Sequence, residues 1–275
     1  MRQPTTEDES ELDASRAPLL DHLIELRTRV IRSVIAFVLA FFVCYYFAVD
    51  IYAFLAHPLD VALAGQSNHH MIYTAVYEAF FTYVKVGMFG ALCIAFPYMA
   101  TQLWLFIAPG LFRHERRAFL PFLLATPVMF IAGGAFVYYL MLPLGLRFFL
   151  SFQTTGANGG IPIELQAKVG DWLSFVMTLI FAFGLCFELP VLLTLLGRVG
   201  IVSSAFLAKG RRYAIVGIFV VAAVVTPPDM WSQLSLAIPL IGLYEVSIWC
   251  VWLMERQRGK AENSTQTAVV PTPGE

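Results

Sequence analysis

Three glutamates occupy positions where a carboxylate needs an explanation. Glu188 lies deep in the apolar run FGLCFELPVLL, where an ionised carboxylate is costly unless it is protonated, paired or wetted. Pro190 follows it and leaves a backbone carbonyl without its helical partner. This pattern predicts a polar contact for another helix or a proton site; the alternative is a glutamate satisfied inside the protein by a neighbouring polar side chain.

The other two glutamates lie in polar segments that border apolar runs. Glu25 belongs to the amphipathic segment LLDHLIELRTRV and precedes Arg29 by four residues, so the two can pair on one helix face. A solvated helix face would show the same pair. Glu115 belongs to IAPGLFRHERRAF, where a single acid stands among basic residues. Membrane topology explains the arginines there but not Glu115, which indicates packing, pairing or recognition.

The sequence motifs of enzymes are absent or broken. His114 and Glu115 could open an HExxH zinc motif, but Ala118 stands where the second histidine is needed. There is no GxSxG, Walker A or GxGxxG motif, and no aspartate lies in the middle of an apolar run. The cysteines lack metal-binding spacing and read as small buried apolar residues. These observations predict a receptor or conduit with no catalytic residue, no metal and no cofactor.

Composition predicts the setting in which these residues work. The 275 residues are 59% hydrophobic and 13% charged, with a mean hydropathy of +0.71. Soluble domains average roughly 45–50% apolar and about 25% charged residues. The chain is therefore expected to be an all-α integral membrane protein. Its net charge of −1 predicts no nucleic-acid partner.

Six apolar runs are candidates for membrane-spanning helices, because they are continuous rather than alternating as in a β-barrel. They cover Val30–Val49, Ala79–Ile107, Phe119–Phe149, Trp172–Leu196, Tyr213–Thr226 and Leu234–Met254. The fifth would be only about 21 Å long at 1.5 Å per residue. The alternative is a helix that begins earlier, near Phe206, although the basic residues after it favour headgroups.

Charge between the runs predicts orientation. Of the 18 Lys and Arg residues, 15 fall in the N-terminal and C-terminal tails and in the loops after the second and fourth runs. The positive-inside rule then places both termini in the cytoplasm. We expect a flexible tail over residues 1–17, a six-helix membrane domain over 18–258 and a disordered tail over 259–275. Residues 50–78 and 153–171 should form a cap on the outer face.

Four ordered segments resemble the TatC family, the multispanning component of the twin-arginine protein translocase. They are HLIELRTR, IAPGLFRHERR, FGLCFELPV and VVTPPDMWSQLSLAIPLIGLYE. The resemblance covers about Leu20–Glu255. It implies six helices in a cupped bundle, located in the inner membrane of a bacterium. It also implies a receptor for signal peptides with consecutive arginines, which moves folded proteins by using the proton-motive force.

The resemblance also implies roles for particular residues. The signal-peptide site would include Glu25, Glu115, Arg27 and Phe106, and the site for partner subunits would include Glu188 and Gln233. Further positions that match the family motifs are Pro58, Pro109 and Asp229. The implied partners are TatA-like and TatB-like single-span subunits, precursor proteins, membrane lipid and further copies of the chain.

A second hypothesis from the residues alone is a proton-coupled secondary transporter of small solutes that uses Glu188. Such transporters usually show internal repeats and several polar residues that converge inside the membrane. The sequence shows no repeat and chiefly one such residue. An intramembrane enzyme is a third hypothesis, opposed by the missing motifs.

Overall fold

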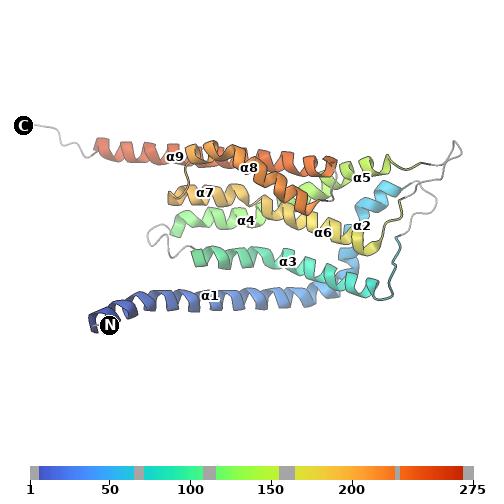
Figure 1. Ribbon diagram of the computed structural model, residues 1–275, viewed down its shortest axis with the longest axis horizontal. Coiled ribbons are helices and arrows are strands. Elements are labelled where there is room, and N and C mark those ends of the chain that lie inside the picture. Colours follow the sequence, from blue (N-terminus) through green and yellow to red (C-terminus); the bar gives the residue numbers. More distant parts are fainter. Residues whose placement is uncertain (1–5, 65–70, 108–115, 155–164, 227–229, 269–275) are drawn as a thin grey trace, which may run out of the picture.

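The computed structural model describes residues 6–64, 71–107, 116–154, 165–226 and 230–268, and these residues are mostly helical (Figure 1). The elements are α1 (Thr6–Tyr46), α2 (Ala48–Leu63), α3 (Glu78–Ile107), α4 (Arg116–Phe136), the π-helix η2 (Val137–Met141), α5 (Leu142–Leu150), α6 (Val169–Cys186), α7 (Leu189–Val199), α8 (Ser204–Val225) and α9 (Met230–Ala268).

Five stretches of the described residues are long and apolar enough to cross a membrane. They are His22–Tyr46, Glu78–Phe106, Pro121–Leu150, Val169–Arg198 and Gln233–Gln257. Helix α8, which contains most of the fifth predicted run, is not among these five; its 22 residues include Lys209, Arg211 and Arg212. The beginning of α1 and the end of α9 lie at the same end of the bundle, as an even number of crossings requires (Figure 1). The chain is thus a multi-pass membrane protein.

Three boundaries differ from the sequence predictions. Helix α8 begins at Ser204, where the Ser203 hydroxyl accepts the Phe206 N–H at 3.1 Å, so the alternative with an early start is correct. Its apolar part still begins only at Tyr213. Helices α1 and α9 also extend from Thr6 and to Ala268, into segments that we expected to be tails.

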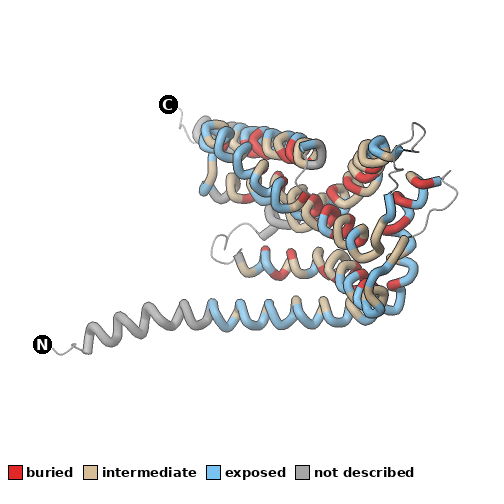
Figure 2. The backbone as a smooth tube through the Cα atoms, turned by 45° about the vertical axis from the view of Figure 1, so that its right-hand side comes forward, coloured by how far each residue is buried: buried red, intermediate tan, exposed pale blue. Residues whose placement is uncertain are grey.

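Helix α6 lies at the centre of the packed core. Its Leu173, Val176 and Phe183 are completely buried, and the same core cluster includes residues of α2, α3, η2, α8 and α9. Helix α1, in contrast, packs chiefly against α3 and is exposed along most of its described length (Figure 2). Because α1 stands apart from the core, one side of the bundle is hollowed between α1 and α6.

Two glycines allow α4 and α6 to approach closely. A Cβ on Gly133 would lie 2.6 Å from the carbonyl oxygen of Phe183, and one on Gly184 would lie 2.6 Å from the Phe130 ring. A helix backbone cannot shift to accept such a contact without a loss of stability. The Gly133-Gly134 pair, which interrupts the third apolar run, therefore allows α4 to pack closely against α6.

We expect Gly133→Ala to lower the free energy of unfolding by about 1–3 kcal/mol, the usual cost of overpacking. Unfolding of the purified protein in mixed micelles, titrated with sodium dodecyl sulfate, measures this change. Gly217→Ala in α8 is the matched control, because no atom lies within 4 Å of its added Cβ. That variant should be as stable as the wild type or slightly more stable. Equal loss in both variants would contradict the packing explanation.

At the end of the bundle opposite the beginning of α1, two connecting segments are joined into a cap. Ile72 pairs with Lys168 in a parallel bridge, with hydrogen bonds from Ile72 N–H to the Ala167 carbonyl and from Val169 N–H to the Ile72 carbonyl, both 3.0 Å. We call this end the cap end and the other the open end. The sequence placed both segments on one face of the bundle, and the structure brings them into contact.

Glu78, at the start of α3, holds the two segments of the cap through hydrogen bonds to both. One carboxylate oxygen accepts the Thr74 and Ala75 N–H groups at 2.9 and 3.3 Å. The other accepts the Gly170 N–H at 3.2 Å and lies 3.8 Å from the Lys168 ammonium. A single side chain thus holds both connecting segments at the first turn of α3.

Pro58 is buried within α2 on the same end. Because proline has no N–H, the carbonyl of Phe54 loses its helical donor. The Tyr138 hydroxyl donates to that carbonyl at 2.9 Å, and the two aromatic rings stack with centroids 4.3 Å apart. Pro58 therefore shapes the contact between α2 and η2 and lies far from the open end.

Candidate functional site

A long groove occupies the hollow side of the bundle. Its open-end part has a volume of about 620 Å³ and is formed by α1, α3, α4, α6 and α7. A second part of about 540 Å³ continues toward the cap end between α1, α3 and α6. The two parts share Leu92, Phe181 and Leu185, and together we call them the concave groove. Most of the side chains that line it are apolar.

Glu25 lies beside the open-end rim of the concave groove: it does not line the groove itself, but its neighbour Leu26 and its ion-pair partner Arg29 do. One oxygen, Oε1, accepts from Nη2 and Nε of Arg29 at 2.6 and 3.0 Å, one turn further along α1. Arg29 itself lines the groove and also donates to the side-chain oxygen of Gln102 in α3 at 3.4 Å. The second oxygen of Glu25 has no hydrogen bond to any described residue, and the side chain is 35% exposed. The carboxylate is therefore oriented and still able to accept a further donor.

Phe106, at the end of α3, lines the same rim. Its ring stacks on His22 of α1, with centroids 4.2 Å apart and planes 16° apart. This contact joins α3 to the turn of α1 that carries Glu25. The structure thus brings Glu25 and Phe106 together, whereas Arg27 is exposed and does not line the groove.

Glu188 lies at the break between α6 and α7. Helix α6 ends at Cys186, and α7 begins at Leu189 with Pro190 in its first turn. The Glu188 side chain lines the concave groove together with Thr126 of α4, whose hydroxyl donates to a carbonyl of its own helix at 3.2 Å. Thr126 lies close enough to interact weakly with the Glu188 carboxylate, but neither buried oxygen has a well-formed hydrogen bond among the described residues. A buried acceptor without a donor costs free energy that a polar ligand or partner could recover.

Gln233 does not line the concave groove. It lies near the start of α9, where its amide donates to the carbonyl of Phe219 in α8 at 3.3 Å. No described contact joins it to Glu188, so the pair that the sequence grouped as one site is not brought together. Pro109, Glu115 and Asp229, also selected from the sequence, lie outside the described residues.

The sequence analysis missed Gln102 and Arg29 as parts of the rim. Gln102 is buried, and a polar residue within the apolar run ending at Ile107 was a signal that could have identified it. Glu245, a further acid within the last apolar run, pairs with Arg211 of α8 at 2.8 Å and is exposed. Glu245 therefore has a charged partner among the described residues, unlike Glu188.

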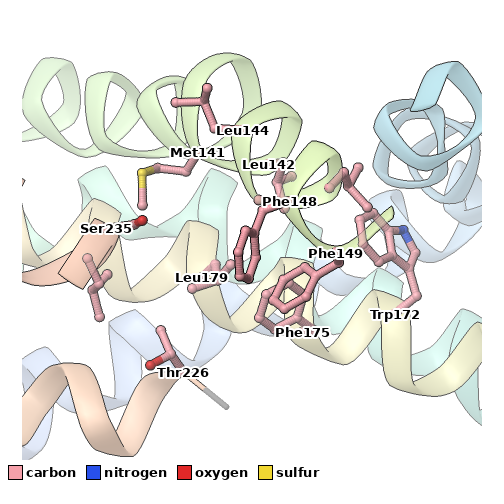
Figure 3. A pocket seen from close by; sticks show the side chains of 13 residues that line it. Met141, Leu142, Leu144, Phe148, Phe149, Trp172, Phe175, Leu179, Thr226 and Ser235 are labelled. Carbon is pink, nitrogen blue, oxygen red and sulfur yellow. The ribbon is translucent and has the colours of Figure 1, made fainter. Parts of the chain in front are cut away.

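A separate cavity of about 320 Å³ lies between η2, α5 and α6 near the start of α9. Figure 3 shows the rings of Phe148, Phe149 and Phe175 along it. Its only polar side chains besides Trp172 are the hydroxyls Thr226 and Ser235, and Thr226 donates to its own helix. Among the described residues no charged side chain lines this cavity, whereas Arg29, Lys85 and Glu188 line the concave groove.

Comparison with known proteins agrees with this geometry. Residues 21–239 match the family model described as Sec-independent protein translocase protein (TatC). The chain is 49% identical over 247 residues to the Sec-independent protein translocase protein TatC of Magnetococcus marinus, with 90% of this chain and 88% of that protein covered. It is 40% identical over 232 residues to the TatC protein of Escherichia coli K12, with 84% and 87% covered.

A solved structure shares the fold as well. A crystal structure titled as the twin-arginine translocase receptor TatC in DDM superposes with a TM-score of 0.73 at 37% identity, over 83% of this chain and 98% of that chain. This chain therefore belongs to the TatC family of Sec-independent protein translocase proteins.

Proposed function

We propose that the chain is the receptor for twin-arginine signal peptides and the scaffold of a translocase that moves folded proteins. The observation that carries this proposal is the carboxylate of Glu25 beside the rim of a long apolar groove. Arg29 orients this carboxylate through one oxygen, and the other oxygen has no hydrogen bond to a described residue. A signal with tandem arginines followed by an apolar segment matches this arrangement, with charge at the rim and apolar surface beyond it.

The chemistry of arginine supports the rim as the recognition site. A guanidinium is always charged and binds carboxylates through two parallel hydrogen bonds. Glu25 offers its second oxygen, and Glu115 would supply a second carboxylate for the second arginine. The basic residues Arg27 and Arg29 would otherwise repel such a peptide, so the two acids must reverse the local field.

We further propose that Glu188 receives a polar side chain from a single-span subunit of the TatA or TatB type. Neither of its two buried oxygens has a well-formed hydrogen bond to a described residue, which supports this role. A hydrogen bond between helices meets little competition from water inside a membrane. Phe181, Leu185 and Leu192 beside it provide an apolar surface for the partner helix.

The proposal also assigns the orientation of the chain in the membrane and the energy source for transport. The open end faces the cytoplasm of a bacterium, because 15 of the 18 basic residues fall in the segments assigned to that side. A signal peptide then meets Glu25 and the proposed Glu115 site first. The sequence has no Walker A motif. We take the proton-motive force as the energy source because the resemblance to the TatC family implies it.

Binding of a purified precursor to the chain in nanodiscs tests the proposal. A twin-arginine precursor should bind more tightly than the same precursor with two lysines, because lysine cannot form the bidentate contact. A precursor with two glutamines should bind least. Equal affinity for all three precursors would contradict recognition of the arginines by this chain.

A further inference from the structure

The cap-end part of the concave groove contains a lysine. Lys85 is exposed on α3 and lines this part together with Ser174 and Thr178 of α6. It lies seven residues, or about 10 Å, along α3 from Glu78. Within the described residues Lys85 forms no ion pair, whereas Lys168 and Arg211 each have an acid partner. A cation inside a membrane span without such a partner marks a site of contact.

The two hydroxyls beside Lys85 are also available. Other hydroxyls in the spans donate to a carbonyl one turn earlier, as Thr82, Thr101 and Ser247 do. Ser174 and Thr178 form no such bond within the described part of the chain. They lie four residues apart, on one face of α6. The groove therefore presents an ammonium and two hydroxyls, all donors, at one level of an apolar surface.

We propose that Lys85, Ser174 and Thr178 bind the carbonyl end of an apolar helix that occupies the concave groove. The last carbonyls of a helix have no donor within the helix and carry a partial negative charge. Three donors, one of them cationic, complement that end. The inference rests on the proposed function, because the helix it assigns is the apolar segment that follows the two arginines.

Length and polarity both fit this occupant. Lys85 and Phe106 are 21 residues apart on α3, which corresponds to about 32 Å. A helix of about 20 residues covers this distance. If its arginines bind at the rim beside Phe106, its N-terminal end lies at the open end and its carbonyl end reaches Lys85. A lysine is favourable at this end of a helix and unfavourable at the other.

Synthetic peptides of different lengths test the inference. Each carries two arginines followed by an apolar helix of about 14 or about 20 residues and ends in an amide, so that no carboxylate is added. Affinity is measured for the full chain in nanodiscs of zwitterionic lipid. Lys85→Met should weaken binding of the longer peptide about 3- to 10-fold and leave the shorter peptide unaffected, because only the longer helix reaches this level.

Two variants control the experiment. Lys85→Arg should retain the affinity for the longer peptide, because it preserves the charge. Lys209→Met, which removes an exposed lysine of α8 outside the groove, should bind both peptides like the wild type. Equal loss for both peptide lengths in Lys85→Met would overturn the inference, since Lys85 would then act on the fold.

A lipid phosphate could use the same donors, and the experiment separates it from the helix. If the effect of Lys85→Met appears only when phosphatidylglycerol is added, the site belongs to lipid and the inference is overturned. Failure of the proposed function has a different signature. In that case a twin-lysine peptide of about 20 residues would bind the wild type as tightly as the twin-arginine peptide, whatever the result at Lys85.

Discussion

Glu25→Gln should weaken binding of a twin-arginine precursor roughly 10- to 100-fold, because a charge-assisted hydrogen bond contributes about 1.5–3 kcal/mol. The amide keeps the shape of the side chain and removes its charge. Titration of the purified chain with a fluorescent precursor measures the change. We expect the same direction for Glu115→Gln if each acid accepts one arginine.

Glu25 also holds Arg29, so the loss of that ion pair needs its own control. Arg29→Gln breaks the same pair but leaves the carboxylate in place and removes a positive charge from the rim. This variant should bind the precursor at least as tightly as the wild type. Asp50→Asn, on an exposed carboxylate of α2, should have no effect. If Arg29→Gln loses as much affinity as Glu25→Gln, the pair is structural and the recognition site lies elsewhere.

Glu188→Ala should weaken association with a TatB-like single-span helix about 3- to 30-fold, as expected for the loss of one hydrogen bond between membrane helices. The chain itself should remain folded and inserted, because the oxygens of Glu188 have no well-formed hydrogen bond to a described residue and their removal costs at most a weak contact with Thr126. Energy transfer between labelled subunits in nanodiscs reports the association, and unfolding in mixed micelles reports the stability.

Two further variants serve as controls for the effect of Glu188→Ala on association. Glu188→Gln should recover part of the association, because an amide oxygen can still accept a hydrogen bond. Glu245→Gln alters the other acid within the apolar spans, which already pairs with Arg211, and should leave association unchanged. If Glu188→Ala prevents stable accumulation of the chain, Glu188 serves the fold and not a partner.

Much of the architecture follows directly from residue type and spacing. Continuous apolar runs can cross a bilayer only as helices, because every backbone group must be satisfied internally. The positions of four of the five described spans were therefore predictable to within three residues at each end, whereas the first begins eight residues earlier than predicted. The start of α8 was not predictable in this way, because Lys209, Arg211 and Arg212 suggest a boundary while backbone hydrogen bonding continues the helix through them.

Glu188 and Gln233 illustrate the limit of prediction within the candidate site. Glu188 lies within the fourth apolar run and its type alone identifies it, whereas Gln233 directly precedes the sixth run and was implied by the family resemblance. The structure gives the amide of Gln233 a carbonyl of α8 and leaves the oxygens of Glu188 in the concave groove. Hydropathy along the chain does not determine which neighbouring helix a side chain contacts. Whether Glu188 and Gln233 belong to one site depends on those contacts.

The sequence by itself determined the membrane setting, the six crossings and the out-of-place acids, because burial in lipid restricts which residues each segment can carry. Only the tertiary structure decided that α1 stands apart from α6 and opens a groove between them, and that Glu25 lies beside the rim lined by Phe106. These features depend on contacts between residues far apart in the chain, such as Gly133 against Phe183 and His22 against Phe106. A pattern along one helix fixes which residues share a face, and the packing of several helices fixes what that face meets.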